Sequence, residues 1–247
     1  MTASAVIFIV LSCEIKNVMQ RFLRARGFIY YLRAFLVFGL TFGAGAAVQY
    51  FARNKIGTQQ ATNLMWAFLS IVFLVAIRIS GAGKWKGGGK PVGFDKIQLL
   101  LCLFTPALFF LHNYFLVRQA AENGLAANLQ QPLYLTLFAF ALSSLGEEIV
   151  YRGFIQTYIN DNIGTGRYEI SRGNRYASLL MVISHVGFFA VMDIFSAITA
   201  LLLVGLFSFV AGFIRDRTGS ILIPVILHIL VNYVHVFTQL CFVGDRY

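Results

Sequence analysis

The chain has 247 residues, of which 58% are hydrophobic and 12% are charged, and its mean hydropathy is +0.74. Soluble domains carry about 25% charged residues, so this composition indicates a membrane protein and excludes a disordered chain, a coiled coil and a disulfide-rich secreted domain. The net charge of +10 comes without a nucleic-acid recognition motif, and in a membrane protein such charge is typical of cytoplasmic loops. We therefore expect a lipid bilayer around the protein and no nucleic-acid partner.

Membrane-spanning helices need about 20 mostly apolar residues. Seven segments fit this length, and they are residues 28–51, 60–79, 97–117, 131–157, 176–192, 194–214 and 219–243. Residues 2–13 are apolar but short, and they represent either a truncated first span or a signal-anchor remnant. The predicted fold is therefore an all-α polytopic membrane helical bundle of about seven to eight transmembrane helices.

Basic residues are distributed unevenly between the two sides of this predicted bundle. Most of the 20 Lys and Arg residues fall in alternate loops on one side, whereas the other side holds few, among them Arg118. The positive-inside tendency makes the first side cytoplasmic. We expect a multi-pass protein of the cell membrane, either the plasma membrane or an inner membrane.

Ionisable residues inside membrane segments are costly, by about 2.5–3.5 kcal/mol each on insertion scales, and therefore mark functional sites. Glu147 and Glu148 stand next to each other within an apolar run. Other polar residues in predicted spans are His112, Asn113, His185, His228, Asn232 and His235. These residues are the candidates for a site inside the bundle.

Helical periodicity sorts the candidates by direction. Glu148 and Arg152 are four residues apart and share a face, so we expect them to form a charge pair. Glu147 lies about 140° from Arg152 around the helix, which leaves its carboxylate available for chemistry. His228 and Asn232 are also four residues apart and project together from the last span.

The predicted topology also brings residues of three spans to one depth. Glu147, His185 and His228 each lie about 14–15 Å from the cytoplasmic end of their span, at 1.5 Å per residue. A carboxylate, two imidazoles and an amide in a protein-lined cavity can polarise a water molecule and stabilise an oxyanion. Hydrolysis of a peptide bond has these requirements.

Three motifs resemble those of the CPBP family of intramembrane glutamate proteases, also called CAAX prenyl endopeptidase-like or Abi proteins. The run Glu147-Glu148-Ile-Val-Tyr-Arg152 is similar to the family's EExxxR motif, and His228-Ile-Leu-Val-Asn232 to its HxxxN motif. The middle motif, FxxxH, corresponds to Met181-Val-Ile-Ser-His185, in which Met replaces Phe. The resemblance covers about residues 131–235. We therefore divide the chain into N-terminal transmembrane helices, residues 1–130, and a catalytic helical core, residues 131–243.

The resemblance implies a role for each residue of these motifs. Glu147 would be the general base, assisted by His185, while His228 and Asn232 would bind the oxyanion. Glu148 and Arg152 would support the structure or place the substrate. The implied activity is metal-independent hydrolysis, without a cofactor, of a peptide bond in a membrane-associated protein or peptide. Family members act on CAAX proteins, on C-terminal sorting tails or on bacteriocins.

Other functions remain open at this point. A zinc metalloprotease would use Glu147, His185 and His228 as ligands, although HExxH is absent. The three cysteines, Cys13, Cys102 and Cys241, lack CxxC spacing and indicate neither a zinc cluster nor a disulfide framework. A proton-coupled carrier using Glu147, or an immunity protein that binds a peptide without cutting it, are the non-enzymatic alternatives. His112, Asn113 and His235 match no family motif, and we expect them to be structural.

Overall fold

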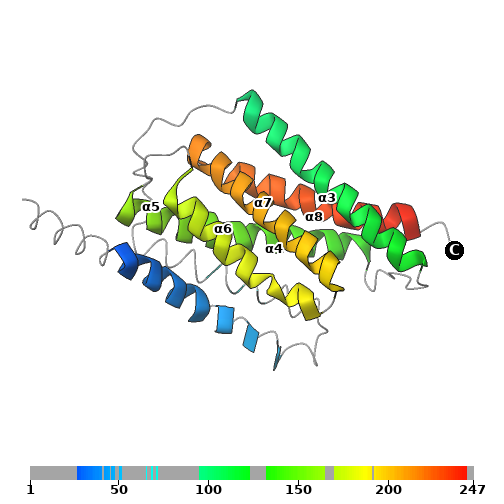
Figure 1. Cartoon of the computed structure of the whole chain (residues 1–247), viewed down its shortest axis with the longest axis horizontal. Coiled ribbons are helices and arrows are strands. Elements are labelled where there is room, and N and C mark those ends of the chain that lie inside the picture. Colours follow the sequence, from blue (N-terminus) through cyan, green and yellow to red (C-terminus); the bar gives the residue numbers. More distant parts are fainter. Residues whose placement is uncertain are drawn as a thin grey trace, which may run out of the picture.

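The computed structural model describes residues 27–51 and 65–71 in part, and residues 95–122, 132–164, 170–190 and 192–243. Every regular element within these residues is a helix (Figure 1). In chain order after the N-terminal helical segment Gly27–Ala44, the helices are α3 (Lys96–Glu122), α4 (Leu133–Glu148), the π-helix η1 (Ile149–Gln156), α5 (Thr157–Ile163), α6 (Arg172–Ser184), the 3₁₀-helix η2 (Val186–Ala190), α7 (Ile194–Thr218) and α8 (Leu222–Val243).

Five of the described helical segments are long and apolar enough to cross a membrane. They are Gly27–Ala44, Lys96–Gln119, Leu133–Ile163, Ile194–Thr218 and Leu222–Cys241. The prediction of an all-α membrane bundle is confirmed. The predicted span 60–79 and the short segment 2–13 lie outside the described residues, apart from single positions, so the total of seven to eight helices stays a prediction.

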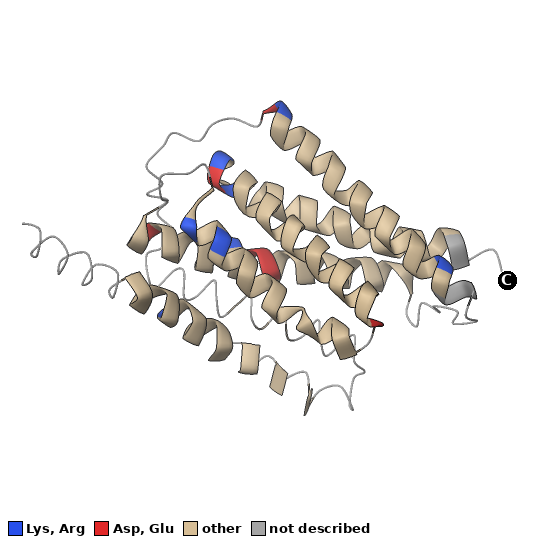
Figure 2. Ribbon diagram, viewed as in Figure 1, with Lys and Arg blue, Asp and Glu red and all other residues tan. Residues whose placement is uncertain are grey.

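The helices run in alternating directions along the bundle, so each end of the bundle collects defined helix ends (Figure 1). At one end of the bundle, α3 and α6 begin and α7 finishes. We call this the basic end, because these helix ends carry Lys96, Arg172, Arg175, Arg215 and Arg217 (Figure 2). At the opposite end, α3 and α6 finish and α4 and α7 begin. The charge asymmetry predicted from the loops therefore extends to the described helix ends.

The predicted span 176–192 is not a single membrane-crossing helix. Helix α6 has 13 residues, or about 20 Å at 1.5 Å per residue, which is shorter than the roughly 30 Å hydrocarbon core. It ends at Ser184 because His185, with φ −99° and ψ 5°, leaves the α conformation. The carboxylate of Asp193 then caps α7 by accepting from the main-chain nitrogens of Phe195 and Ser196. The continuous apolar sequence of residues 176–192 gave no sign of this break in the helix.

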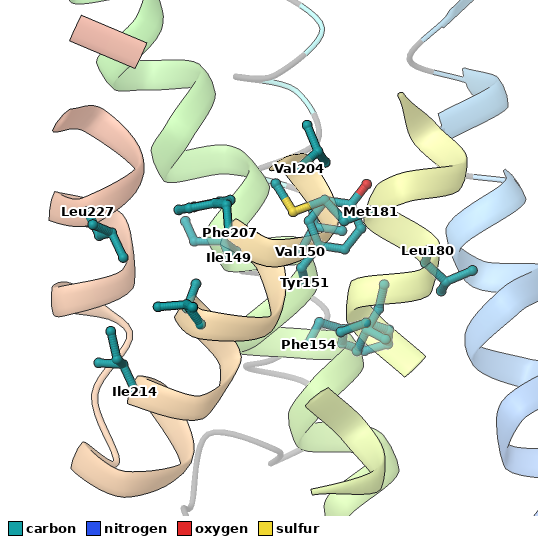
Figure 3. Packing of buried hydrophobic residues seen from close by; sticks show 14 of the residues in the cluster. Ile149, Val150, Tyr151, Phe154, Leu180, Met181, Val204, Phe207, Ile214 and Leu227 are labelled. Atoms are coloured by element: carbon teal, nitrogen blue, oxygen red, sulfur yellow. The ribbon is translucent and has the colours of Figure 1, made fainter. Parts of the chain in front are cut away.

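The core forms where η1 packs against α6 and α7 (Figure 3). Side chains from all three helices are almost completely removed from the surface, including Tyr151, Ile155, Leu180, Met181 and Phe207. The eight-residue π-helix follows α4 without interruption and continues into α5. Such π-helical segments occur frequently at functional sites, and this one begins directly after Glu148.

A row of hydrogen bonds, which we call the polar ladder, joins the segment η1–α5 to α7. Its three steps repeat at an offset of 56 residues and pair Arg152 with Ser208, Gln156 with Gly212, and Asn160 with Asp216. The constant offset means that the two segments run in the same direction, each contributing one residue per helical turn. These hydrogen bonds, from side chains to main-chain and side-chain oxygens, thus fix the segment η1–α5 against α7 next to the candidate site.

Two glycines allow the close helix contacts beside this ladder. A Cβ atom at Gly212 would overlap the side-chain oxygen of Asn174 in α6, and a Cβ atom at Gly173 would overlap the main-chain oxygen of Gln156. Asn174 also donates to the main-chain oxygen of Phe209 at 3.0 Å. The three segments can approach this closely only because neither glycine carries a side chain.

Candidate active site

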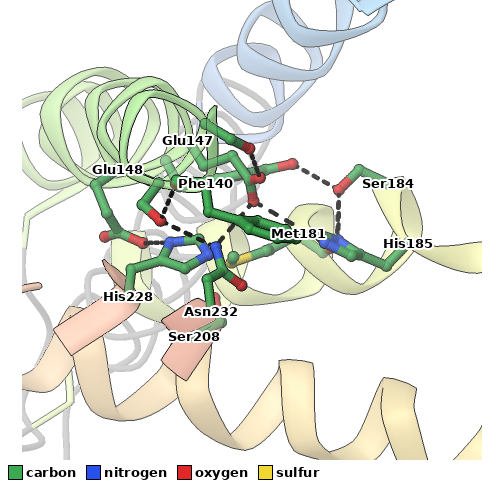
Figure 4. A network of polar contacts seen from close by, with 12 residues as sticks. Phe140, Glu147, Glu148, Met181, Ser184, His185, Ser208, His228 and Asn232 are labelled. Atoms are coloured by element: carbon green, nitrogen blue, oxygen red, sulfur yellow. Dashed lines mark hydrogen bonds and ion pairs between the residues drawn. The ribbon is translucent and has the colours of Figure 1, made fainter. Parts of the chain in front are cut away.

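Glu147 lies in the last turn of α4 with 5% of its surface exposed. The hydroxyl of Ser143, one turn earlier on the same face, donates to Oε1 of Glu147 at 3.1 Å. The other carboxylate oxygen, Oε2, has no hydrogen-bond partner among the described residues. It lies 3.9 Å from Nε2 of His185 and 4.0 Å from Nε2 of His228 (Figure 4).

The imidazole of His185 is oriented by the last turn of α6. Its Nδ1 atom lies 2.8 Å from the main-chain oxygen of Met181 and 3.1 Å from the hydroxyl of Ser184. A carbonyl oxygen can only accept, so Nδ1 carries the proton that is donated to Met181. In the neutral ring, Nε2 therefore presents its lone pair on the side of Glu147.

Met181 occupies the position at which the family motif has Phe, and its side chain is 1% exposed. The group that orients His185 is the main-chain oxygen of this residue, which is independent of the side chain. The Met181 sulfur also lies 3.8 Å from a guanidinium nitrogen of Arg152. Replacement of the motif phenylalanine therefore leaves the histidine's acceptor in place.

His228 projects from α8 and is held by the second glutamate. Its Nδ1 atom lies 3.0 Å from Oε1 of Glu148, and its ring centroid is 4.6 Å from that of Phe207. Glu148 is completely buried, and its Oε2 atom lies 3.3 Å from Nε of Arg152. The carboxylate thus accepts a hydrogen bond from His228 and forms an ion pair with Arg152, and the first contact directs the Nε2 atom of His228 to Glu147.

The predicted charge pair between Glu148 and Arg152 is present, and each member also binds a residue of another helix. Arg152 donates from one nitrogen to both the main-chain oxygen and the hydroxyl of Ser208, each at 2.7 Å. Both members of the pair are 0% exposed. A chain of polar contacts therefore runs from α7 through α4 and η1 to the imidazole on α8.

Asn232 lies one turn after His228 on α8, as its spacing predicted. Its amide nitrogen donates to the hydroxyl of Ser144 at 3.0 Å, and that hydroxyl donates to the main-chain oxygen of Phe140 at 2.7 Å. The sequence reasoning missed Ser143 and Ser144. Their signal was a pair of serines four residues, or about one helical turn, before the pair of glutamates.

The structure thus brings together residues from three separate helices, for which the predicted topology gave the same depth in the membrane. Glu147, His185 and His228 surround a common point, and Asn232 adjoins them. The described residues contain no group of three or more His, Cys, Asp or Glu side chains that could hold a metal ion. The zinc alternative therefore lacks a preformed ligand set in this part of the chain.

A cavity of about 270 Å³ opens beside these residues. His185, His228 and Asn232 line it, together with apolar side chains from α3, α6, α7 and α8. From this level the cavity continues toward the opposite end of the bundle, where His112, Asn113 and His235 also line it. Residues expected to be structural therefore share the cavity with the candidate site.

Comparison with protein families finds a match over part of the chain. Residues 129–234 match the family model described as type II CAAX prenyl endopeptidase Rce1-like. This segment is similar to the Rce1-like family. The comparisons with curated proteins and with solved structures found no match.

The Rce1-like segment includes Glu147, His185, His228 and Asn232 and ends just before His235. The family is a family of proteases, and the apolar helices place the chain among multi-pass membrane proteins. The suspected resemblance to the CAAX protease-like group is confirmed over this segment. The match does not extend to residues 1–128, so the division into an N-terminal part and a catalytic core remains a proposal.

Proposed function

We propose that this chain is an intramembrane endopeptidase of the CAAX type in which Glu147 activates the attacking water. The observation that carries the proposal is the position of Oε2 of Glu147, 3.9 Å and 4.0 Å from the Nε2 atoms of two oriented imidazoles. These separations exceed hydrogen-bond distance and suit groups that share a water molecule. Two other contacts of the site, at Ser143 and Glu148, support the same geometry.

In the first step, Glu147 takes a proton from the water while the water oxygen attacks the carbonyl carbon of the scissile bond. The carboxylate suits this role because Ser143 holds Oε1 and leaves Oε2 directed at the imidazoles. His185 can accept a hydrogen bond from the same water at Nε2, since its Nδ1 atom donates to Met181. General-base assistance of this kind contributes about 10²–10⁴-fold to a rate.

The negative charge that develops on the carbonyl oxygen requires donors. Asn232 has a second amide hydrogen in addition to the one donated to Ser144. His228 becomes a donor at Nε2 when its ring is protonated, and Nδ1 then still donates to Glu148, whose charge balances the imidazolium. These two residues therefore form the oxyanion-binding pair, one turn apart on α8.

Collapse of the tetrahedral intermediate breaks the carbon–nitrogen bond. The proton held by Glu147 passes to the leaving amine, either directly or through His185. The products are a carboxylic acid and a free amine, and no oxidant or reductant is consumed. Glu148 and Arg152 act as positioning residues, because they contact His228 and α7 rather than the common point.

The proposed substrate is a membrane-associated peptide with a C-terminal CAAX sequence, in which the cysteine carries a prenyl group. The family assignment supports this class, and so do the apolar side chains that line most of the cavity. A prenyl chain also anchors the peptide to the bilayer that contains the active site.

The test uses the full chain reconstituted in lipid vesicles with a synthetic prenylated CAAX peptide. We expect cleavage by the natural sequence and a loss of at least about 10²-fold in the Glu147→Gln variant, which keeps the size of the side chain and removes the base. The matched control is Asp161→Asn, an exposed acidic residue of α5, which should cleave at the natural rate. Equal rates in the natural chain and Glu147→Gln would refute the assignment.

The non-enzymatic alternatives give different outcomes in the same preparation. If the chain is an immunity protein, the natural sequence and the Glu147→Gln variant should bind the peptide equally well, and neither should release a product. A carrier would move protons across the vesicle membrane when peptide is added, and mass spectrometry would find the peptide intact. Comparing the terminal peptides of membrane proteins in cells that express either form then identifies natural substrates.

A further inference from the structure

Tyr151 carries a buried hydroxyl group to which the proposed reaction assigns no role. The residue lies in η1, four positions after Glu147, and is completely buried. Its ring packs near those of Phe38 and Phe42, with centroids 6.0 Å and 6.4 Å away. Its hydroxyl donates to Oγ of Ser184 at 2.7 Å. Ser184 is the last residue of α6 and immediately precedes the imidazole of the candidate site.

The end of α6 supplies an acceptor for the side chains around this contact. The main-chain nitrogen of His185 donates to the oxygen of Val182, three residues earlier, at 3.0 Å. In a continuing α-helix it would donate to Met181, four residues earlier. The main-chain oxygen of Met181 is therefore available to side chains. It lies 2.7 Å from Oγ of Ser184 and 2.8 Å from Nδ1 of His185.

These distances determine where each hydrogen points. Because a carbonyl oxygen only accepts, Ser184 and His185 both donate to Met181. The single hydroxyl hydrogen of Ser184 is then used, so its oxygen accepts from Tyr151. The same oxygen lies 3.1 Å from Nδ1 of His185 and is a second acceptor for it. Both neighbours of Nδ1 are thus acceptors, which favours the tautomer whose Nε2 keeps its lone pair.

The contact between Tyr151 and Ser184 also joins the two segments that carry the reacting groups. Tyr151 follows Glu147 by about one turn, and Ser184 adjoins His185. We propose that Tyr151 is a positioning residue that acts through Ser184 to hold His185 protonated at Nδ1 and at a water-sharing distance from Glu147. This inference rests on the proposed function. It adds two residues that stand at unspecified positions of the EExxxR and FxxxH motifs.

Removal of the Tyr151 hydroxyl would release Ser184 and loosen the end of α6 relative to η1. The ring of His185 would then be oriented by fewer contacts, and its Nε2-protonated form would become more populated. That form cannot accept a hydrogen from the attacking water at Nε2. Misplacement of a reacting group by about 1 Å can cost about 10²-fold in rate. For the loss of one neutral hydrogen bond we expect about 10-fold.

The first test measures cleavage of the prenylated peptide by Tyr151→Phe, which keeps the ring and removes the hydroxyl. We expect kcat to fall about 10-fold and KM to stay within about twofold. The matched control is Tyr176→Phe in α6, which removes a hydroxyl that donates to the main-chain oxygen of Tyr31 at 2.8 Å. This control should retain the natural kcat. Equal losses of kcat in the two variants, or a rise in KM alone, would overturn the proposal.

Substitutions of Ser184 test whether Tyr151 acts through it. Ser184→Ala should lower kcat by about 10-fold, whereas Ser184→Thr keeps the hydroxyl and should stay within about threefold of the natural rate. The double variant Tyr151→Phe/Ser184→Ala should be no worse than either single variant, because all three remove the same link. A loss of about 100-fold in the double variant would contradict this role, since it would mean independent effects.

Nuclear magnetic resonance separates this inference from the proposed function, because it requires no cleavage. The full chain is labelled with ¹⁵N-histidine in lipid vesicles, at a pH at which the rings are neutral, and His185→Gln identifies the signals of that residue. We expect Nδ1 to be protonated in the natural chain and in Tyr176→Phe, with a larger Nε2-protonated share in Tyr151→Phe. This pattern supports the inference even if no peptide is cleaved. Protonation at Nε2 in the natural chain, or an unchanged tautomer in Tyr151→Phe, would refute it even if peptides are cleaved.

Discussion

Oε1 of Glu148 lies 3.0 Å from Nδ1 of His228, and through this contact α4 holds an imidazole that belongs to α8. The same carboxylate faces Arg152 with its other oxygen. The second glutamate of the motif therefore does more than neutralise an arginine. By binding Nδ1 of His228, it orients the ring so that Nε2 faces Glu147.

This relationship predicts separate effects on stability and activity. Glu148→Leu leaves the buried guanidinium of Arg152 without its carboxylate, and we expect a loss of about 3–5 kcal/mol in the free energy of unfolding. The double variant Glu148→Leu/Arg152→Met should recover most of this stability, because the pair is replaced by apolar groups. Unfolding of both variants is followed in detergent micelles.

Peptide cleavage should not recover in the double variant, since His228 still lacks its acceptor. We expect a rate at least about 10²-fold below that of the natural chain. A stable double variant with natural activity would show that Glu148 serves the fold alone.

Ser144 orients Asn232, so Ser144→Ala should lower kcat by about 10-fold and leave KM nearly unchanged. The reason is that the amide donor is needed most when charge develops on the carbonyl oxygen. The control is Ser178→Ala, which removes a different buried hydroxyl, in α6, and it should retain kcat. A rise in KM alone would instead place Asn232 in ground-state binding.

Met181→Leu should keep cleavage within about threefold of the natural rate, because volume-conserving core substitutions are well tolerated and the main-chain acceptor of His185 is unchanged. His185→Leu should reduce the rate by about 10² or more. Steady-state cleavage of the prenylated peptide measures both variants. Similar losses in the two would mean that the Met181 side chain itself takes part in the reaction.

A metal-independent reaction predicts that chelators have no effect. Dialysis against a strong zinc chelator should leave the cleavage rate unchanged, and added zinc should not increase it. Loss of activity that returns on adding zinc would favour the metalloprotease alternative.

Gly212→Ala should destabilise the protein by about 1–3 kcal/mol, because its methyl group would overlap the side chain of Asn174. Gly187→Ala is the control, since a Cβ atom there would meet no atom within 4 Å. Thermal unfolding in the same detergent compares the two variants. An unchanged melting temperature for Gly212→Ala would mean that α6 and α7 can separate at no cost.

Sequence reasoning predicted the all-helical membrane fold and the residue pairs within single helices, but not the exact ends of the helices or the contacts between them. Fixed spacings within one helix sufficed for Glu148 with Arg152 and for His228 with Asn232, because residues four apart share a face. The contact between Glu148 and His228 joins residues 80 positions apart, and no helical period contains that information. The roles assigned to these residues stay predictions.

The break at His185 shows why one predicted span was wrong. Hydropathy measures how apolar a segment is, and residues 186–190 continue the apolar run of the second half of α6. The end of α6 depends instead on the backbone angles of His185 and on the Asp193 cap. The π-helix was equally hidden, since the expected angle between Glu147 and Arg152 assumed α-helical geometry throughout.

The polar ladder repeats every four residues on both partners, and by itself it is compatible with a shift of one helical turn, about 5.4 Å. The contact of Gly212 with Asn174 does not repeat: after such a shift, Ser208 or Asp216 would meet the asparagine. A single missing side chain therefore selects one alignment of the helices. Since lipid is as apolar as the helix surfaces and drives no particular pairing between them, this glycine fixes the alignment of α7 with α6, the helix at whose end His185 lies.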